Sequence, residues 1–471
     1  MRSTDNPLAA YLQRIGWKPR DLGRAINAWL EIRGRTGERI HPTTPYSWIK
    51  RGFCPYEPYP QIIADILSTR LGSIVTRHDL WPGRIIADSS PRSADDGLGS
   101  SWSVDDVARE MDKLIDHGPI SYVPTQGSRL IVPALYGRQG RPQSVNGVRT
   151  DRVDPPLMNL IVRHIADLRR LDDRVGGGAL SLRYVGNELH AVLDLLRNAI
   201  CRSQVHDRLL LAAGDLAQLS GWMHCDAGEH GSGQRYLLLA IRAARTATES
   251  PDPDIRLLAC ESAANVLGML AYQSAHTGQS DDALRLAEAA AESARSARPA
   301  TRARLAGRLA TAYAAAGDVR GFRDSAETAR LLLEKRGAED PAFLYYLNED
   351  QLSAEAGQAL VDLARHRSSE RKRLLAEAIE LLTPLTSSGL REDYQRSALL
   401  HGCYLVQAHL HDHDLEAAAK AAHMALARLP EVQSGRCRAL LRSLRRSMGR
   451  RSRNPYIADL LPELDAALPT A

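Results

Sequence analysis

The chain has 471 residues, of which 44% are apolar and 25% are charged, so it is long enough to bury a large core and should fold into two or three domains. No stretch approaches the roughly 18 apolar residues that a membrane helix needs, and the first residues lack the pattern of a cleaved signal peptide. We therefore expect a cytoplasmic protein with no membrane partner. The six cysteines include no C-x-x-C pair, which indicates reduced thiols rather than a zinc ribbon or a disulfide framework.

The net charge is only +5, but it is unevenly distributed. Residues 1–84 carry 13 basic and 7 acidic side chains, and residues 436–453 carry eight arginines and no acid, so the middle of the chain is acidic. Basic segments of this kind can contact a polyphosphate. A solvated basic helix is the alternative interpretation of residues 436–453, and charge alone does not choose between the two.

Short amphipathic helices are predicted in the first 84 residues. Pro7 is a favoured first helical residue, and apolar residues then recur at helical spacing until Gly16, which ends the helix. A second helix begins near Pro19 and gives way to a polar loop at residues 33–41. A fourth helix is predicted where isoleucine and leucine repeat at helical spacing over residues 62–71.

The stretch HPTTPYSWIKRG, residues 41–52, predicts a third helix of about two turns. Thr44 is a good N-cap, Pro45 is a favoured first residue, and Gly52 is a stop signal. Trp48 and the following isoleucine would pack inward, and the polar residues of the stretch would face outward. The prediction is a polar, basic helix anchored by its tryptophan.

Short helices in this order, with a polar and basic third one, are typical of a repressor-type helix-turn-helix domain, whose third helix enters the major groove. There Lys50 and Arg51 could reach phosphates or a guanine edge, and neighbouring hydroxyl groups could bind phosphate or bases. The loop at residues 33–41 is longer than the three or four residues of the compact motif, so a small dimerisation or docking module is the alternative. The predicted DNA-binding residues are Thr43, Thr44, Tyr46, Ser47, Lys50 and Arg51 around the third helix, and Arg20 and Arg24 on the second.

From about residue 206 onward the chain is rich in alanine and leucine, and it contains a repeat. The stretch LATAYAAAGDVRGF, residues 309–322, has the tetratricopeptide pattern, and the same frame fits three other segments, with room for a degenerate copy around residues 352–386. A residue that tolerates a left-handed conformation is needed where the first helix of each hairpin turns into the second. These turn positions are Gly228, Gly278, Gly317 and His413.

The predicted fold class is therefore all-α, with a small helix-turn-helix-like N-terminal domain followed by a right-handed, tetratricopeptide-like α-solenoid. Each hairpin exposes an apolar face that only its neighbours can cover, so the copies should stack around a concave inner surface that binds a peptide, a protein or a small ligand. The predicted domains are a DNA-binding domain at 1–84, a linker at 85–155 with a short helix at 103–117, a helical cap at 156–205 with helices at 156–171 and 182–197, and the solenoid at 206–471.

The sequence contains no catalytic motif that we identify. The stretch GGGAL, residues 176–180, lacks both a preceding strand and a following G-K-[ST], which indicates a flexible turn rather than a phosphate loop. The histidines of HCDAGEH and HLHDH could hold a metal, but His224, His409 and His413 fall at ordinary hairpin positions of the repeat frame. We therefore expect no enzyme activity, no cofactor and no bound metal.

Five stretches of the chain together carry a family resemblance: NPLAAYLQRIGWKPRDLGRAIN, IHPTTPYSWIKRG, RRLDDRVGGGAL, LAQLSGWMHCDAGEHGSGQRYLLLAIRAAR and YYLNEDQLSAEAG. They resemble actinobacterial regulators, of the kind found in streptomycetes, that join an N-terminal helix-turn-helix-like domain to tetratricopeptide repeats. The resemblance spans most of the chain except the linker and residues 436–453. It implies a transcriptional regulator, often one tied to antibiotic production or sporulation, with residues 43–51 as its recognition helix.

The resulting hypothesis is a homodimeric regulator that binds double-stranded DNA through its N-terminal domain. Its solenoid would mediate dimerisation, sense a peptide, protein or small-molecule effector, or recruit a partner. A change in the solenoid would then alter the spacing of two DNA-binding heads, since a dimer reads paired half-sites at a fixed separation. The alternative is an interaction scaffold that sequesters a peptide or another regulator without touching DNA, and a third possibility places the nucleic-acid surface at residues 436–453.

Overall fold

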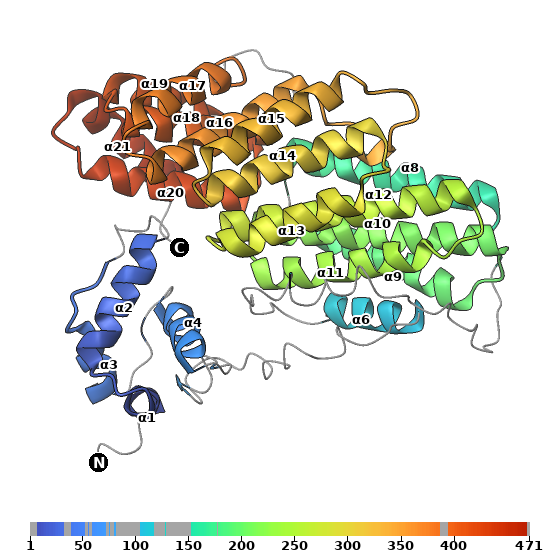
Figure 1. The fold of residues 1–471 in the computed structure, drawn as a ribbon, viewed down its shortest axis with the longest axis horizontal. Coiled ribbons are helices and arrows are strands. Elements are labelled where there is room, and N and C mark those ends of the chain that lie inside the picture. The colour runs from blue at the N-terminus through green and yellow to red at the C-terminus, as the bar shows by residue number, and fades with distance from the viewer. Residues whose placement is uncertain are drawn as a thin grey trace. The chain divides into compact units, whose positions relative to one another are not determined.

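In the computed structural model the chain folds into α-helices that form two compact units, Met1–Ala94 and Asp95–Ala471 (Figure 1). The all-α fold class predicted from the sequence is confirmed. Within the part of the chain that the structure describes, no helix is long and apolar enough to cross a membrane. The described residues are 7–32, 39–51, 55, 59–71, 75, 80–81, 104–116, 128, 152–176, 178–386 and 394–468.

The helices of the first unit begin and end close to the predicted positions. They are α1 (Pro7–Arg14), α2 (Pro19–Ile32), α3 (Thr44–Arg51) and α4 (Tyr59–Leu71). After α1, Gly16 adopts a positive φ of 69°, and the amide of Trp17 donates to the Leu12 carbonyl oxygen, which is the usual way of closing a helix C-terminus. The apolar stripes of all four helices meet in one core, whose buried members include Leu8, Leu12, Leu22, Ile26, Leu30, Trp48, Ile62, Ile63 and Leu67.

The end of the long connection between α2 and α3 is fixed to α2. Asn27 donates its side-chain amide to the Ile40 carbonyl oxygen and accepts from the Ile40 amide, at 2.8 and 2.9 Å. One turn earlier, Gly23 lies so close to Pro42 that a Cβ atom on the glycine would stand 2.5 Å from the Pro42 carbonyl oxygen. The chain therefore enters α3 from a defined position on α2, although the connection is longer than in a compact helix-turn-helix.

The second unit is a solenoid of helical hairpins, as the repeat pattern predicted. The two helices of each hairpin contact one another, and each hairpin packs on the next. The degenerate copy predicted around residues 352–386 is the hairpin α16–α17. The hairpins are α10 (Ser203–Ala227) with α11 (His230–Ala247), α12 (Pro253–His276) with α13 (Ser280–Ser293), α14 (Pro299–Ala315) with α15 (Val319–Leu333), α16 (Glu349–His366) with α17 (Arg371–Leu382), α18 (Gln395–His411) with α19 (Leu415–Arg428), and α20 (Gly435–Gly449) with α21 (Pro455–Ala467).

Four hairpin turns use the residues that the repeat frame predicted. Gly228, Gly278 and Gly317 adopt positive φ values of 90°, 77° and 76°, and His413 adopts 65°. A left-handed conformation reverses the chain after the first helix and costs a glycine nothing sterically. Within the described residues His413 is the one non-glycine residue at positive φ, so this turn carries local strain.

Three helices precede the hairpins: α6 (Val104–Asp116), α8 (Pro155–Val175) and α9 (Ala179–Asn198). They agree with the short helices predicted at 103–117, 156–171 and 182–197. The glycine-rich stretch 176–180 joins α8 to α9, and Gly176 there has a positive φ of 84°. The helix α6, predicted as part of a linker, buries Val107 and Met111 in the core of the second unit and contacts α9 and α11.

The first helices of the hairpins form a closed row. Each contacts the next in the order α10, α12, α14, α16, α18 and α20, and α20 then contacts α10. At this closing contact the first residue of α20, Gly435, lies against the end of α10, where a Cβ atom on the glycine would stand 2.7 Å from the Ala227 carbonyl oxygen. The inner surface predicted as concave is therefore the interior of a ring of first helices.

The strained turn at His413 yields a test of the repeat frame. Replacing His413 with glycine should stabilise the chain by about 0.5–1 kcal/mol, because the relief of left-handed strain exceeds the entropic cost of a glycine. The Gly228→Ala variant is the matched control, since its Cβ atom would meet nothing within 4 Å and only the backbone conformation is penalised. It should lose about 1 kcal/mol. Urea unfolding of both variants measures this, and a loss of stability in His413→Gly would contradict the assignment.

Candidate functional site

The helix α3 is buried on one side and exposed on the other. Trp48 is only 4% exposed, and its ring lies 6.0 Å from that of Tyr59 between centroids. On the opposite side Tyr46 is 47% exposed, and Thr43 and Lys50 are also exposed. Tyr46 and Lys50 lie on one face of α3, and Thr43 directly precedes the helix on the same side. The three residues form an outward stripe with an aromatic ring and a positive charge, while the Thr43 hydroxyl is hydrogen-bonded to the His41 ring at 2.7 Å.

Two of the predicted hydroxyl groups are less available. Thr44 and Ser47 are half-buried, and the Ser47 Oγ donates to the Thr44 carbonyl oxygen at 2.7 Å. Arg51 is the last residue of α3, and its side chain lies outside what the structure describes. Thr44 and Ser47 thus lie at the edge of the exposed surface of α3, beside the outward stripe.

The two predicted arginines of α2 are exposed. The Arg24 guanidinium lies 3.8 Å from the Asp21 carboxylate. Arg20 precedes Gly23 by three residues and Asn27 by seven, so it shares the face of α2 that packs against residues 40–42. Arg20 therefore lies on the side of α2 from which the chain enters α3.

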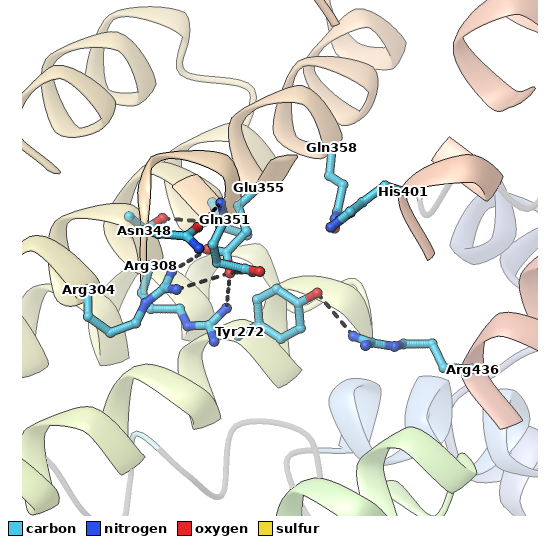
Figure 2. A network of polar contacts seen from close by, with 11 residues as sticks. Tyr272, Arg304, Arg308, Asn348, Gln351, Glu355, Gln358, His401 and Arg436 are labelled. Atoms are coloured by element: carbon cyan, nitrogen blue, oxygen red, sulfur yellow. Dashed lines mark hydrogen bonds and ion pairs between the residues drawn. The ribbon is translucent and has the colours of Figure 1, made fainter. Parts of the chain in front are cut away.

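A second candidate site, not predicted from the sequence, lies inside the ring of first helices (Figure 2). The helices α10, α12, α14, α16, α18 and α20 each place polar or aromatic side chains there, on surfaces that are otherwise alanine and leucine. Figure 2 shows Arg304, Arg308 and Glu355 gathered on one side of Tyr272, with Arg436 at its hydroxyl end. We call these side chains the interior network: Trp222, Asp226, Tyr272, Arg304, Arg308, Glu355, Gln358, His401 and Arg436.

One carboxylate in this network serves two guanidinium groups. Both Glu355 oxygens accept from Arg304, one of them at 3.1 Å, and one oxygen also accepts from Gln351 at 2.8 Å. The Arg308 Nη1 lies 3.6 Å from Glu355, beyond hydrogen-bonding geometry. Burial alone would raise the pKa of Glu355, but the two arginines outweigh it and lower that pKa to about 2. Glu355 is therefore a buried carboxylate that stays charged.

Tyr272 lies between the two parts of the interior network. The Arg308 Cζ is 4.3 Å from its ring centroid, and the Arg436 Nη1 donates to its hydroxyl oxygen at 3.1 Å. Arg436 also lies over the Trp222 ring, with its Cζ 5.3 Å from the centroid, and its Nε is 3.4 Å from the Asp226 carboxylate. Two arginines thus approach a single tyrosine from α14 and α20, and cation–π attraction favours both positions.

Further buried ion pairs join the two ends of the solenoid. Arg396 of α18 binds Asp173 of α8 at 2.8 Å, and its Nη1 lies 3.3 Å from Asp172 and 3.9 Å from Asp226 of α10. Burial raises the pKa of Asp172 to about 7, against the opposing effect of Arg396 and with the support of its acidic neighbours Asp173 and Asp226. The first and last parts of the ring are therefore held together by charges removed from water.

The histidines considered for metal binding have other contacts. His224 forms a 2.6 Å hydrogen bond with Glu229 and stacks on Tyr236, with centroids 5.2 Å apart. His401, which we had not considered, bonds Gln358 at 2.8 Å inside the ring. Among the described residues, no group of three or more His, Cys, Asp or Glu side chains is arranged to hold a metal ion.

The sequence did contain a signal for the interior network. Tyr272, Arg304, Arg308 and Glu355 interrupt the apolar residues of first helices, near positions that the repeat frame assigns to helix packing. A charged residue at such a position means either that the repeat frame is misaligned there or that the residue is buried and paired with an opposite charge. Recognising the pairs needed the tertiary structure, because the partners lie on different helices, 36 or more residues apart.

The shared carboxylate predicts a large difference between two similar ion pairs. Glu355→Gln should cost about 3–5 kcal/mol, because it leaves two buried guanidinium groups without a counter-ion. Glu377→Gln is the matched control, since Glu377 binds Arg323 through two hydrogen bonds but is 34% exposed, and it should cost about 1 kcal/mol or less. Urea unfolding measures both, and equal losses would show that the interior network is not the buried cluster described.

The raised pKa of Asp172 predicts a pH-dependent effect. Its folded pKa of about 7 exceeds the ordinary value of 3.8, so its contribution to stability is complete below about pH 4 and is lost as the pH rises through 7. Asp172→Asn carries a neutral amide at every pH. The stability of this variant relative to the wild type should therefore rise between pH 5 and 7, by at most about 1.4 kcal/mol per pH unit. A difference that stays flat across this range in urea titrations would refute the shift.

Comparison with known proteins bears on the first unit only. Residues 8–80 match the family model described as the SP15 N-terminal domain, a span that runs from α1 past α4. No curated protein and no solved structure matches the chain. The similarity to that domain family therefore covers the helices α1 to α4 of the first unit, α3 included.

Proposed function

We propose that the chain is a transcriptional regulator that binds double-stranded DNA through α3 of its N-terminal unit. The observation that carries this proposal is the outward stripe Thr43, Tyr46 and Lys50 on a helix anchored by Trp48. Such a helix can enter a major groove and present its side chains to phosphates and base edges. Arg20 adds a second positive charge on the adjoining face of α2.

The geometry around α3 supports a role in recognising a DNA sequence rather than a helix whose polar side chains only face water. The helix packs on α2, and the chain before it is fixed by the Asn27–Ile40 hydrogen bonds. A recognition helix must hold its register against DNA, which requires such fixed entry and packing.

The proposed role of the solenoid is to receive an effector or a partner and to mediate homodimerisation. Two copies would then present two α3 helices to paired half-sites, and a change in the solenoid would alter their spacing. The process that such a regulator would control, by the resemblance stated above, is secondary metabolism or development.

The test is a salt titration of DNA binding with fragments of the chain's own upstream DNA. The Lys50→Ala, Arg51→Ala double variant should lose sequence-selective binding, and the slope of log K against log salt should become shallower by about 1 per lost phosphate contact. Fluorescence anisotropy of labelled fragments measures both. Circular dichroism should show an intact fold, because Lys50 is exposed.

The matched control is Lys372→Ala with Arg373→Ala, which removes the same two charges from exposed positions of α17. This variant should bind selectively with the wild-type slope. Weak binding that ignores sequence and is unchanged in the first variant would contradict the proposal. It would favour the alternative of an interaction scaffold that does not act on DNA.

A further inference from the structure

The interior network contains a buried arginine with no carboxylate of its own. Arg308 is 5% exposed, and its Nη1 has no hydrogen-bond partner among the described residues. The carboxylate nearest to it, Glu355, already accepts two hydrogen bonds from Arg304 and one from Gln351. A buried charge that is incompletely paired is costly, so a folded protein that keeps one usually has a use for it.

Arg436, on the other side of Tyr272, is also incompletely hydrogen-bonded. Its Nε has no hydrogen-bond partner among the described residues and lies 3.4 Å from Asp226. Arg396 lies 3.9 Å from the same oxygen, but it has Asp172 and Asp173 as further partners. Beside Tyr272, Arg308 and Arg436 therefore each have a guanidinium nitrogen without a hydrogen-bond partner among the described residues.

His401, on α18, is kept neutral because burial lowers its pKa to about 4, although Glu355 partly opposes the lowering. His276 is exposed, four residues beyond Tyr272 on α12, and its ring lies 3.9 Å from the tyrosine ring. Since four residues span about 6 Å of helix, accessible surface reaches to within one turn of Tyr272.

We propose that Arg308 and Arg436 bind the oxyanion group, a carboxylate or a phosphate, of a small effector beside Tyr272 within the ring. Guanidinium groups match both oxyanions through paired hydrogen bonds. Arg308 and His276 already cover the Tyr272 ring, at 4.3 and 3.9 Å from its centroid, so the proposed contact is with the guanidinium donors rather than with the ring. We take the ligand to be small because the first helices contact one another in a closed row around the interior network.

Binding has a structural consequence for the ring. Arg308 belongs to α14 and Arg436 to α20, so an anion held by both joins the middle of the solenoid to its last hairpin. The ligand then stabilises the closed form by its preference for that form. The inference rests on the proposed function only in naming the ligand an effector, since the binding itself needs no DNA.

The test is thermal unfolding of the full chain in rising concentrations of sodium phosphate or sodium acetate, with ionic strength held constant by sodium chloride. One of the two anions should raise Tm saturably, by about 2 °C or more, and chloride alone should not. A response to phosphate assigns a phosphate ligand, and a response to acetate assigns a carboxylate. Absence of a saturable response to either anion overturns the proposal.

Three variants locate the site. Arg308→Gln and Arg436→Gln should abolish the response, and Arg308→Lys should weaken it because lysine lacks the fork of donors. Arg323→Gln, which removes an exposed arginine of α15, should keep the full response. Without added anion, Arg308→Gln should unfold at the wild-type Tm or above it, because it removes an incompletely paired buried charge. A full response in Arg308→Gln would overturn the assignment, whatever the result of the DNA titration.

Discussion

The second unit depends on ion pairs that are buried where its two ends meet. Arg396 of α18 binds Asp173 of α8, and Arg436 of α20 lies 3.4 Å from Asp226 of α10, so residues more than two hundred positions apart in sequence hold the ring closed. Hairpin stacking alone would produce an open superhelix, because each repeat needs only its neighbours. Buried charges tolerate few arrangements, since any loss of a partner leaves a charge without water. The buried ion pairs therefore favour the closed ring over the open superhelix that hairpin stacking alone would produce.

Closure changes what the inner surface can do. In an open solenoid the first helices line a groove along which a peptide can lie, whereas here they surround an interior lined by arginines, aromatic rings and neutral histidines. Low polarity strengthens every electrostatic interaction in such a place, so a single anion matters more there than at the surface. On the proposal made above, the arginines of the interior would therefore select an anionic ligand.

The first unit is stabilised differently, without a buried polar network among its described residues. Its core is apolar, and its polar side chains either fix the chain, as Asn27 does, or face outward, as Lys50 and Tyr46 do. The proposed division of labour is that α3 contacts DNA while the ring receives the signal. On this proposal each unit keeps its own core, and a ligand in the ring would act on DNA binding by changing how two copies are held together.

Much of the fold could be read from local pattern. Pro7, Pro19 and the stretch 41–52 predicted helix starts, and Gly228, Gly278, Gly317 and His413 predicted hairpin turns, because caps, stops and left-handed residues act within a few positions of themselves. The degenerate hairpin α16–α17 was placed by spacing alone. What the sequence by itself determined was therefore the helices and their pairing. The tertiary structure decided the packing of α6 into the second core, the closing of the ring and the interior network around Tyr272, since each depends on residues that meet only when distant helices pack.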